Sequence, residues 1–439
     1  NFGWFLRYTL TKSVGIAMLG MGVVGSGVAR ALSQKSDSLG NQIGANVCLK
    51  SVLVRDKTKQ RSFEIAQNLF TDNFNEILER TDIDIVVEVM GGERPALEFI
   101  LAALESGKHV VTANKEVMAK HAPDIFAAAR RKDVRVLFEA SVAGGTPVVS
   151  PLMRDLVANE VVSIKAIING TTNYILTRMS SEQIDYKTVL KDAQNLGYAE
   201  PDPTNDVEGI DAAYKLAILS TLGFRAQVKD SDVFCEGITS LSAKDFQYAD
   251  ELGYAIKLLA ISSRINGEVQ ARVHPALIEK DQMLAKVDGV LNAIEIETDL
   301  TGRVLFHGPG AGSMPTSSAI VADIINIGRN VAGNAAYLDP VRLSESIKVQ
   351  SISDLQTKYY FRLEAKDEPG VLAQIGSALA LNKISISSFI QKGFDPEQGT
   401  AELVIMTHQA TERSVQSALK DIKDLDVVAR IGNMIRVSE

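Results

Sequence analysis

The sequence predicts an α/β protein built from three successive folding units, and three observations support this prediction. Short apolar runs alternate with amphipathic helical patterns over residues 14–150, which is typical of a parallel sheet covered by helices. The next segment mixes helical patterns with stretches of alternating hydrophobicity, and residues 358–439 follow the order βαββαβ. A chain of 439 residues fits this division, since domains average roughly 150 residues.

Composition and charge describe an ordinary globular protein. Acidic residues outnumber basic ones by 54 to 46, which gives a formal net charge of −8 and argues against general binding to nucleic acid or anionic membranes. No apolar run approaches the ~20 residues that a membrane span requires. We therefore expect neither nucleic acid nor a membrane among the partners.

The cysteines and the first residues carry little functional signal. Cys48 and Cys235 form neither a metal-binding spacing nor a disulfide framework, which favours a reducing cytoplasm. Residues 1–13 precede the first expected strand and contain the single tryptophan. We interpret them as a leader or an appended remnant and assign them no function.

Five apolar runs in residues 14–150 predict the strands of one parallel sheet. Helical patterns such as 95–108 separate them, so consecutive strands are joined by crossovers and helices cover both faces. This arrangement is typical of a doubly wound, Rossmann-like domain. The expected strands are 14–20, 46–56, 83–90, 108–114 and 134–142.

A glycine-rich turn follows the first expected strand and opens a helical pattern. Its glycines have the spacing G-x-G-x-x-G, which allows a tight turn, close approach of a pyrophosphate and packing of the helix on the sheet. A glycine-rich turn without a ligand is the alternative, but strand, turn and helix occur together here. The residues expected to bind a dinucleotide are Gly20, Gly22, Val23, Val24 and Gly25.

The end of the second expected strand bears on the choice of dinucleotide. A lone acidic residue there suits the ribose 2′-hydroxyl of NAD, whereas basic residues suit the 2′-phosphate of NADP. Here Arg55 and Lys57 flank Asp56. The two cations favour NADP, and Asp56 leaves NAD open. A solvated charge cluster without a ligand is the alternative.

Two charged residues lie in a helical pattern that is apolar nearly all round. Asp211 and Lys215 are four residues apart, so they share one helix face. Burial lowers the pKa of a lysine and a nearby carboxylate raises it, so Lys215 is a candidate proton donor or acceptor. Glu200 and Asp206 lie close by in sequence and suit an ammonium group. An ordinary surface salt bridge is the alternative.

Lys115 ends the segment TANK, at the carboxyl end of the fourth expected strand. Open α/β sheets bind ligands at this edge, so Lys115 is a second candidate catalytic residue. A cation at the start of a helix is the alternative. The five histidines are scattered and offer no Ser-His-Asp arrangement or metal-binding set.

Changes of pattern divide the rest of the chain. Residues 151–340 are expected to form an α+β domain and residues 341–357 a polar linker. Residues 358–439 are expected to form a compact ferredoxin-like unit, because their βαββαβ order is typical of that class.

Six motifs, in order along the chain, resemble those of homoserine dehydrogenases. They are GMGVVG, TANK, EASVAGGTP, NGTTNYILT, GYAEPDPTNDVEGIDAAYK and GPGAGSMPTSSAIVADI. The run from Met314 to Ser318 departs from the family's usual small residues without removing a catalytic group. The last unit is similar to an ACT domain, a small amino-acid-sensing module. No aspartokinase-like sequence precedes the dehydrogenase motifs, so the chain resembles the monofunctional form of the enzyme.

The resemblance implies NAD(P)-dependent interconversion of L-aspartate 4-semialdehyde and L-homoserine, in threonine, methionine and isoleucine biosynthesis. It implies that Lys215 exchanges a proton with the substrate oxygen and that Lys115 lies near cofactor and substrate. Glu200 and Asp211 would hold the substrate, with Asp206 in support. Residues 151–340 would bind substrate and mediate dimerisation.

The resemblance also implies further ligand contacts. It places Gly91, Gly197, Glu200 and Gly312 at the cofactor, although Gly312 is alternatively a loop glycine with positive φ. The family carries a monovalent cation, typically sodium, bound mainly by backbone carbonyls. The matching residues are Glu139, Val142, Gly144 and Thr146. A glycine-rich strand exit without a cation is the alternative, and sodium and potassium are not distinguished.

The ACT-like unit implies regulation, with threonine as feedback inhibitor. The segment from Asp367 to Gly370 precedes a helix whose first N–H groups suit a carboxylate, and Asn382 completes the candidate effector residues. An assembly module without a ligand is the alternative. Exposed sheet edges favour pairing of subunits, so a dimer or a tetramer is expected.

Two other functions stay open on the sequence alone. One is a different NAD(P)-dependent amino-acid or semialdehyde dehydrogenase with the same nucleotide fold. The other is a non-catalytic sensor of nucleotide and amino acid. The presence of both Lys115 and Lys215 speaks against the sensor.

Overall fold

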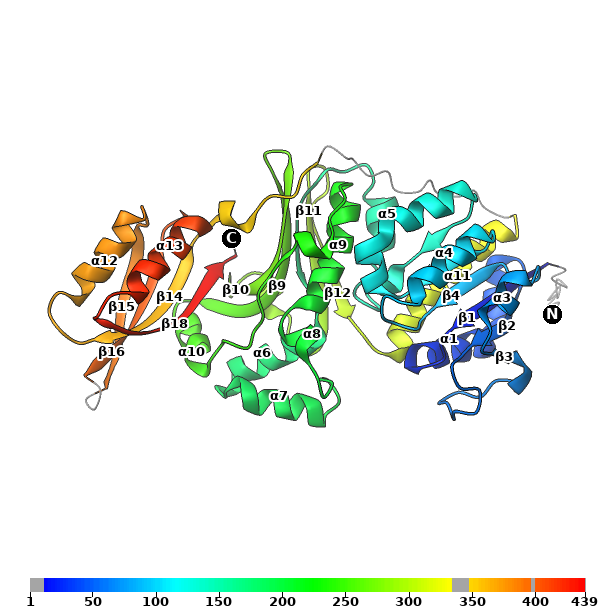
Figure 1. The fold of residues 1–439 in the computed structure, drawn as a ribbon, viewed down its shortest axis with the longest axis horizontal. Helices are drawn as coiled ribbons and strands as arrows, with labels where there is room; N and C mark the ends of the chain where they lie inside the picture. The colour runs from blue at the N-terminus through cyan, green and yellow to red at the C-terminus, as the bar shows by residue number, and fades with distance from the viewer. Residues whose placement is uncertain (1–11, 334–346, 396–398, 439) are drawn as a thin grey trace, which may run out of the picture.

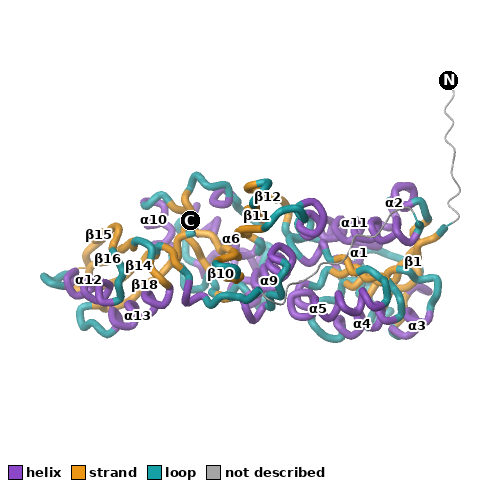
Figure 2. Tube along the Cα trace, turned by 90° about the horizontal axis from the view of Figure 1, so that it is seen from above, coloured by secondary structure: helices purple, strands orange, loops and turns teal. Residues whose placement is uncertain are grey.

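The computed structural model describes residues 12–333, 347–395 and 399–438, which form three units in a row (Figure 1). They are the N-terminal unit (12–155), the middle unit (156–312) and the C-terminal unit (356–438). Figure 2 shows the same row after a turn of 90°, so the molecule is elongated. Among the described residues, no helix combines the length and the apolar character needed to cross a membrane.

The N-terminal unit is a doubly wound parallel sheet, as predicted. Its strands pair in the order β3-β2-β1-β4-β5-β6, so the order reverses between β1 and β4. Open α/β sheets bind ligands beyond the carboxyl ends of the strands at such a reversal. The strands are β1 (Ser13–Leu19), β2 (Asn46–Leu53), β3 (Phe70–Thr71), β4 (Ile85–Glu88), β5 (His109–Thr112) and β6 (Val136–Leu137). The helices are α1 (Val23–Gln34), α2 (Ser36–Ile43), α3 (Phe74–Glu79), α4 (Ala96–Glu105) and α5 (Lys115–Arg131).

Both faces of this sheet are buried, which explains the nearly continuous apolar runs. In β1, Ala17 and Leu19 join one core, with residues of α4 and α5. Ile16 and Met18 join the other core, with residues of α1 and α2. Side chains of a strand alternate between faces, so a strand buried on both sides has no polar face.

The prediction of a fifth strand over residues 134–142 is wrong in length, since the observed strand β6 covers only Val136–Leu137. Only β6 pairs with β5, and a 3₁₀ turn follows at Glu139–Ser141. The Glu139 carboxylate accepts hydrogen bonds from the backbone N–H groups of residues 148–150 at 2.6–3.0 Å, which holds the chain in a turn. The apolar run continues past the strand because Phe138 and Val142 remain in the core. The sequence also does not predict the short strand β3.

The middle unit is a mainly antiparallel sheet with helices against it. Its strands pair in the order β12-β11-β7-β9-β10, and the short β8 pairs in parallel with β10. Helix α9 lies between this sheet and α5 of the N-terminal unit (Figure 1). The strands are β7 (Val161–Ile167), β8 (Phe234–Cys235), β9 (Tyr254–Ile265), β10 (Glu268–Glu279), β11 (Leu291–Thr298) and β12 (Gly302–Pro309). The helices are α6 (Gly170–Glu182), α7 (Tyr186–Asn195), α8 (Thr204–Val207), α9 (Ile210–Phe224) and α10 (Ala243–Glu251).

Helix α11 (Ser313–Val331) follows the middle unit in sequence but packs on the N-terminal unit. Ile320 and Ile324 join the core that contains α1 and α2. The approach to α1 is close, because a Cβ at Gly27 would lie 2.4 Å from Ser317 Oγ. The N-terminal unit is therefore completed by a helix from a distant part of the chain.

The C-terminal unit has the predicted βαββαβ order and ferredoxin-like arrangement. Its strands pair in the order β18-β14-β16-β15, and residues of α12 and α13 share a core with the sheet. Its elements are β14 (Tyr359–Lys366), α12 (Val371–Leu381), β15 (Ile386–Asp395), β16 (Thr400–Thr407), α13 (Glu412–Lys423) and β18 (Val428–Val437). The short strands β13 (Gln356–Thr357) and β17 (Ala410–Thr411) pair with each other.

The sheets of the middle and C-terminal units are continuous. Residues 436–437 of β18 pair in parallel with residues 276–277 of β10. An earlier part of the same edge pairs with β8, and Val269 forms a bridge with Val349. Residues 341–346 of the expected linker lie outside the described residues, and its described part contacts the middle unit at Val349.

Candidate active site

A cleft of about 600 Å³ opens between the N-terminal and middle units. Its walls come from the carboxyl ends of β4 and β5, the segment that leads into α9, and residues 310–311 before α11. Eight of the predicted site residues line it: Val24, Gly91, Lys115, Gly144, Glu200, Asp206, Asp211 and Lys215.

The glycine turn between β1 and α1 has a form that fits a dinucleotide. Gly20 has φ +99°, a left-handed conformation that favours glycine. A Cβ at Gly25 would lie 2.5 Å from the carbonyl oxygen of Gly20, so the helix can approach the strand only with glycine there. A Cβ at Gly22 would have nothing within 4 Å. This open space adjoins the N-terminus of α1, where helix N–H groups favour a phosphate.

Lys115, Asp211 and Lys215 form one ionic cluster in the cleft. Lys215 Nζ donates to Asp211 Oδ2 at 2.7 Å and to the carbonyl oxygen of Ile168 at 2.8 Å. Lys115, the first residue of α5, forms an ion pair with Asp211 Oδ1. Asp211 therefore bridges a lysine of its own helix and a lysine of the opposite unit. An ammonium group has three N–H bonds, so Lys215 keeps one for a ligand in the cleft.

Burial and the charge of the ion-pair partners shift the pKa values of these three groups in opposite directions. Burial lowers the pKa of Lys215 below its usual value, with Lys115 acting the same way and Asp211 opposing both. Burial alone would raise the pKa of Asp211, but the two lysines outweigh it and hold that pKa below its usual range. Burial would also lower the pKa of Lys115, but Asp211 outweighs it and leaves that pKa raised. Of the two lysines, Lys215 therefore loses its proton more readily.

Asn169 positions the carboxylates of the cluster, a role that the sequence does not predict. Its Nδ2 donates to Asp206 Oδ1 at 2.7 Å and to Asp211 Oδ2 at 2.9 Å. Its Oδ1 accepts from the backbone N–H of Thr172 at 2.8 Å and so caps α6. The motif NGTTNYILT contains Asn169, but an asparagine before a helical pattern is sufficiently explained as a cap. Its second role depends on contacts with residues 37 and 42 positions away.

A second group that the sequence does not predict lies where β4 and β5 end. Glu88 is fully buried and accepts hydrogen bonds from Thr112 Oγ1 at 2.6 Å and from the Met90 N–H at 2.7 Å. Burial raises the pKa of Glu88, although these hydrogen bonds oppose the shift. Asn114 Nδ2 donates to the carbonyl oxygen of Gly92 at 2.7 Å. Together these contacts hold the turn after β4 on the cleft wall.

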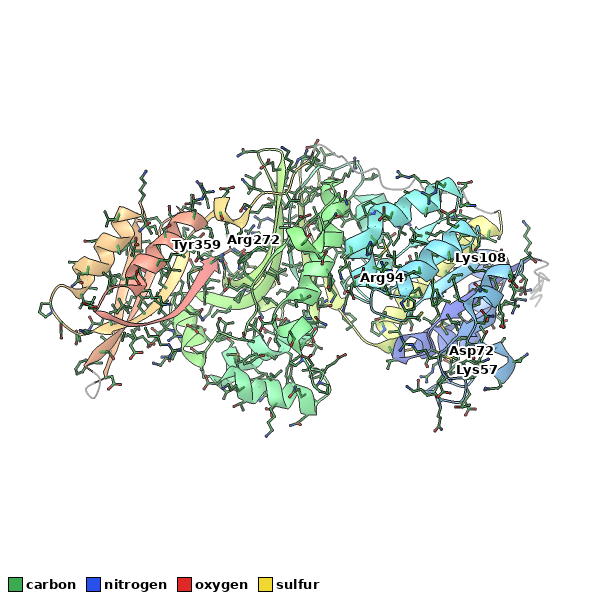
Figure 3. The ribbon with its side chains drawn as sticks, viewed as in Figure 1. Lys57, Asp72, Arg94, Lys108, Arg272 and Tyr359 are labelled. Atoms are coloured by element: carbon green, nitrogen blue, oxygen red, sulfur yellow. The ribbon has the colours of Figure 1, made fainter. Side chains whose placement is uncertain are left out.

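The predicted basic residues lie after the end of β2, outside the cleft lining. Lys57 forms an ion pair with Asp72 at 2.8 Å, at the outer end of the N-terminal unit (Figure 3). Arg55 is exposed, and it forms no ion pair within the described part of the chain. Of the two predicted phosphate contacts, Arg55 is therefore the more accessible, since Lys57 is engaged with Asp72.

The other predicted glycines differ in whether they line the cleft. Gly91, with φ +76°, is part of its wall. Gly312 has φ +119° and precedes α11, directly after the lining residue Ala311. Gly197, with φ +78°, lies in the turn after α7 and is not part of the lining.

The stretch expected to bind a cation lies where the two units meet. A Cβ at Gly144 would lie 2.5 Å from the carbonyl oxygen of Gly310. The Glu139 side chain already accepts three backbone N–H groups, so a cation here would depend on main-chain oxygens such as those of Val142 and Thr146. Within the described ranges, no group of three or more His, Cys, Asp or Glu side chains could hold a metal ion.

The three predicted effector residues do not meet within one chain. Gly370 is the N-cap of α12, and Asp367, three residues earlier, accepts a hydrogen bond from Gln391 Nε2 at 3.1 Å. Asn382 is the C-cap of α12, and its Nδ2 donates to Asp421 Oδ2 at 2.7 Å. Because the 11 residues of α12 span roughly 16 Å, Asn382 lies too far from Gly370 to share one pocket.

Three protein-family models match the chain. The model for homoserine dehydrogenase matches residues 147–325, and the model for the NAD-binding domain of homoserine dehydrogenase matches residues 20–139. The ACT domain model matches residues 359–427. The three matches follow the order of the units in the structure.

Known proteins match over nearly the whole chain. Homoserine dehydrogenase of Neisseria gonorrhoeae is 42% identical over 431 residues, which cover 97% of this chain and 99% of that protein. The Synechocystis sp. enzyme is 44% identical over 434 residues, with the same coverage.

Solved structures of the same enzyme agree with the fold. A homoserine dehydrogenase from Thiobacillus denitrificans superposes with a TM-score of 0.90 at 39% identity, covering 98% of this chain and 99% of that one. A hyperthermophilic archaeal homoserine dehydrogenase in complex with NADPH gives a TM-score of 0.62 at 27% identity, covering 74% of this chain and 100% of that one. This chain, an NAD(P)-dependent oxidoreductase with a C-terminal ACT domain, belongs to the homoserine dehydrogenase family.

Proposed function

We propose that this protein interconverts L-aspartate 4-semialdehyde and L-homoserine with a nicotinamide dinucleotide as redox partner. The observation that carries the proposal is the Lys115–Asp211–Lys215 cluster, which lies in the same cleft as Val24 of the glycine turn. The cluster offers an ammonium group of lowered pKa at the place where the fold receives the cofactor. Family membership supports the choice of substrate.

Proton transfer is assigned to Lys215. When bound, the nicotinamide supplies the hydride that reduces the aldehyde carbon. Lys215 donates the proton of its remaining N–H bond to the carbonyl oxygen, so the C=O group becomes C–OH and the lysine becomes neutral. In the oxidising direction, neutral Lys215 takes the proton of the hydroxyl group. A lowered pKa makes both protonation states accessible nearer neutral pH, which is the requirement for general acid–base catalysis.

Substrate binding is assigned to the acidic wall of the cleft and to Lys115. Glu200 and Asp206 line the cleft and suit the α-ammonium group of the substrate. Lys115 suits the substrate carboxylate. Both oxygens of Asp211 are engaged by lysines, so Asp211 acts on the substrate through them.

NADP is proposed as the preferred cofactor, with Arg55 as the residue that meets its 2′-phosphate. Arg55→Ala is expected to raise the KM for NADPH about tenfold and to leave the KM for NADH within about twofold, since only NADPH loses a charge-assisted hydrogen bond. Steady-state kinetics with both cofactors measure the effect. Lys59→Ala removes an exposed charge on the same surface and is the control, expected to change neither constant. Equal changes for both cofactors in Arg55→Ala would count against the assignment.

Regulation, assembly and location complete the proposal. Threonine is the proposed feedback inhibitor, supported by the ACT domain. Strand β15 ends the shared sheet, and its free edge supports pairing into a dimer or tetramer. We place the protein in the cytoplasm, in threonine, methionine and isoleucine biosynthesis.

A monovalent cation, with sodium preferred, is proposed at Glu139, Val142, Gly144 and Thr146, and no proton-transfer step depends on it.

One set of rates tests the reaction, the cofactor and the effector together. Oxidation of L-homoserine is followed by the absorbance of the reduced cofactor, with NADP⁺ and with NAD⁺, each with and without threonine. The expected result is homoserine-dependent reduction that is faster with NADP⁺ and slower with threonine present. Absence of homoserine-dependent reduction with either cofactor would reject the substrate in favour of another dehydrogenase or a sensor. Insensitivity to threonine would reject the effector alone.

A further inference from the structure

The edge of β10 brings the last strand of the C-terminal unit beside a loop of the middle unit. Strand β8 pairs in parallel with residues 272–273 of β10, and β18 pairs in parallel with residues 276–277 of the same edge. Glu236, the residue after β8, thereby comes close to Arg436 of β18. Arg436 Nη1 donates to Glu236 Oε2 at 2.7 Å.

Arg436 occupies the centre of a buried ionic cluster at this junction. Its side chain is 2% exposed, and its Nε and Nη2 donate to the Glu412 carboxylate at 2.8 and 2.6 Å. The hydroxyl of Tyr359 donates to the same carboxylate at 2.9 Å. Tyr359 also interacts electrostatically with Arg272 of β10, and the two are labelled side by side in Figure 3. Arg436 therefore joins a carboxylate of its own unit to one of the middle unit.

Glu236 begins a loop that packs against the turn before α9. The Ile238 N–H donates to the carbonyl oxygen of Val207 at 2.9 Å, and Cys235 Sγ donates to that of Glu208 at 3.1 Å. A Cβ at Gly237 would lie 2.5 Å from the Val207 carbonyl oxygen, so loop and turn are in direct contact.

The same turn fixes the start of the catalytic helix. Gly209, with φ +81°, is the N-cap of α9. A Cβ at Gly209 would lie 3.0 Å from Cys235 Sγ, so the end of β8, directly before the loop, packs closely on this residue. Asp211 lies two residues further on, within the first turn of the helix. Residues 235–238 therefore contact the backbone turn that directly precedes Asp211.

We propose that Arg436 is a positioning residue for the substrate half of the active site. Through Glu236 it fixes the loop at 235–239, and this loop fixes the turn at 207–209 from which α9 and Asp211 follow. The C-terminal unit is thus part of the homoserine site, although none of its described residues lines the cleft. The glycine turn belongs to the N-terminal unit and does not depend on this contact.

A second ionic contact between the same units provides a matched control. Glu402 of β16 accepts hydrogen bonds from Lys244 at 3.3 Å and from the hydroxyl of Tyr248, both on α10. No residue of α10 lines the cleft. Glu236→Gln and Glu402→Gln therefore make the same chemical change at two contacts, of which only the first leads to α9.

Steady-state kinetics with L-homoserine and NADP⁺, together with thermal unfolding of the full chain, test the inference, which rests on the proposed function. Glu236→Gln is expected to raise the KM for L-homoserine about threefold or more, with the KM for NADP⁺ within about twofold. The Glu236 side chain is 34% exposed, so this variant is expected to fold. Glu402→Gln is expected to lower Tm to a similar extent and to change neither KM.

A double variant separates positioning from general destabilisation. Adding Arg436→Lys to Glu236→Gln is expected to raise the homoserine KM little further. Both changes break the Arg436–Glu236 contact, and the Glu412 contacts that the lysine also alters lie within the C-terminal unit. The inference is overturned if Glu236→Gln lowers Tm with an unchanged homoserine KM, or if Glu402→Gln raises that KM equally. Failure of the unaltered protein to oxidise homoserine would instead overturn the proposed function, and this inference with it.

Discussion

Replacement of Lys215 by alanine is expected to lower kcat by roughly 10²- to 10⁴-fold, the usual contribution of a general acid or base. In the proposed mechanism this side chain carries the proton that the substrate oxygen gains or loses. Lys115 cannot take over this role readily, because its pKa is raised rather than lowered. The glycine turn is untouched, so the Kd for NADPH is expected to stay within about twofold. Initial rates of homoserine oxidation and a fluorescence titration with NADPH measure the two quantities.

A buried lysine elsewhere in the middle unit provides the control. Lys257 of β9 is 4% exposed, and burial lowers its pKa as well. Its Nζ donates to the carbonyl oxygen of Val287 at 2.6 Å, and it is not part of the cleft lining. Lys257→Met is expected to lower Tm with little change in kcat. Near-normal turnover of the Lys215→Ala variant would refute the acid–base assignment.

Replacement of Asp211 by asparagine is expected to lower kcat/KM for L-homoserine by about 100-fold or more and to destabilise the protein. The carboxylate is the partner of both lysines. Its loss leaves the buried Lys215 without its ion-pair partner, while Lys115 is 44% exposed and is partly compensated by water. Removing one partner of a buried ion pair typically costs about 3–5 kcal/mol. Steady-state kinetics and the free energy of unfolding in urea measure the two effects. An Asp211→Asn variant with unchanged stability would contradict the central place of this carboxylate.

The same substitution is expected to shift the pH dependence of homoserine oxidation. Asp211 raises the pKa of Lys215 against the effect of burial, so without it that pKa falls further. In the proposed mechanism oxidation requires neutral Lys215, so activity is expected to rise with pH through this pKa. In the asparagine variant the rising limb of the kcat profile is expected at lower pH. Asp202→Asn, a change at a cleft residue whose carboxylate bonds to Thr204, is expected to leave the limb in place.

Local features of the site could be predicted from the sequence, and the contacts that join them could not. The four-residue spacing of Asp211 and Lys215 on an apolar helix is enough to predict that they pair. The position of Lys115 at the end of β5 is equally local. Its ion pair with Asp211 depends on the packing of α5 against α9, which no local pattern specifies. The contacts of Asn169 with Asp206 and Asp211 could not be predicted either, because they also depend on how distant segments pack.

The fold shows the same division between local pattern and long-range contact. Alternating apolar runs and helical patterns predict the doubly wound sheet and the ferredoxin-like unit, because burial of whole faces leaves a periodic signal. The apolar run at 134–142 predicts a strand that is too long, since core residues continue beyond the last paired one. Two residue pairs join β10 to β18, too few to leave a signal. The amphipathic pattern of α11 predicts a helix with one buried face, but it does not predict that this face packs on the N-terminal unit.

The return of α11 to the N-terminal unit affects the order in which the chain can fold during synthesis. About 280 residues separate the end of α1 from the start of α11, and ribosomes add roughly 5–20 residues per second, so the helix emerges roughly 15–55 s later. Until then, the apolar surface of α1 and α2 that α11 covers is open to solvent or to chaperones. The middle unit leaves the ribosome within this interval. The N-terminal unit is therefore synthesised first, but its core can be completed only after the middle unit has been synthesised.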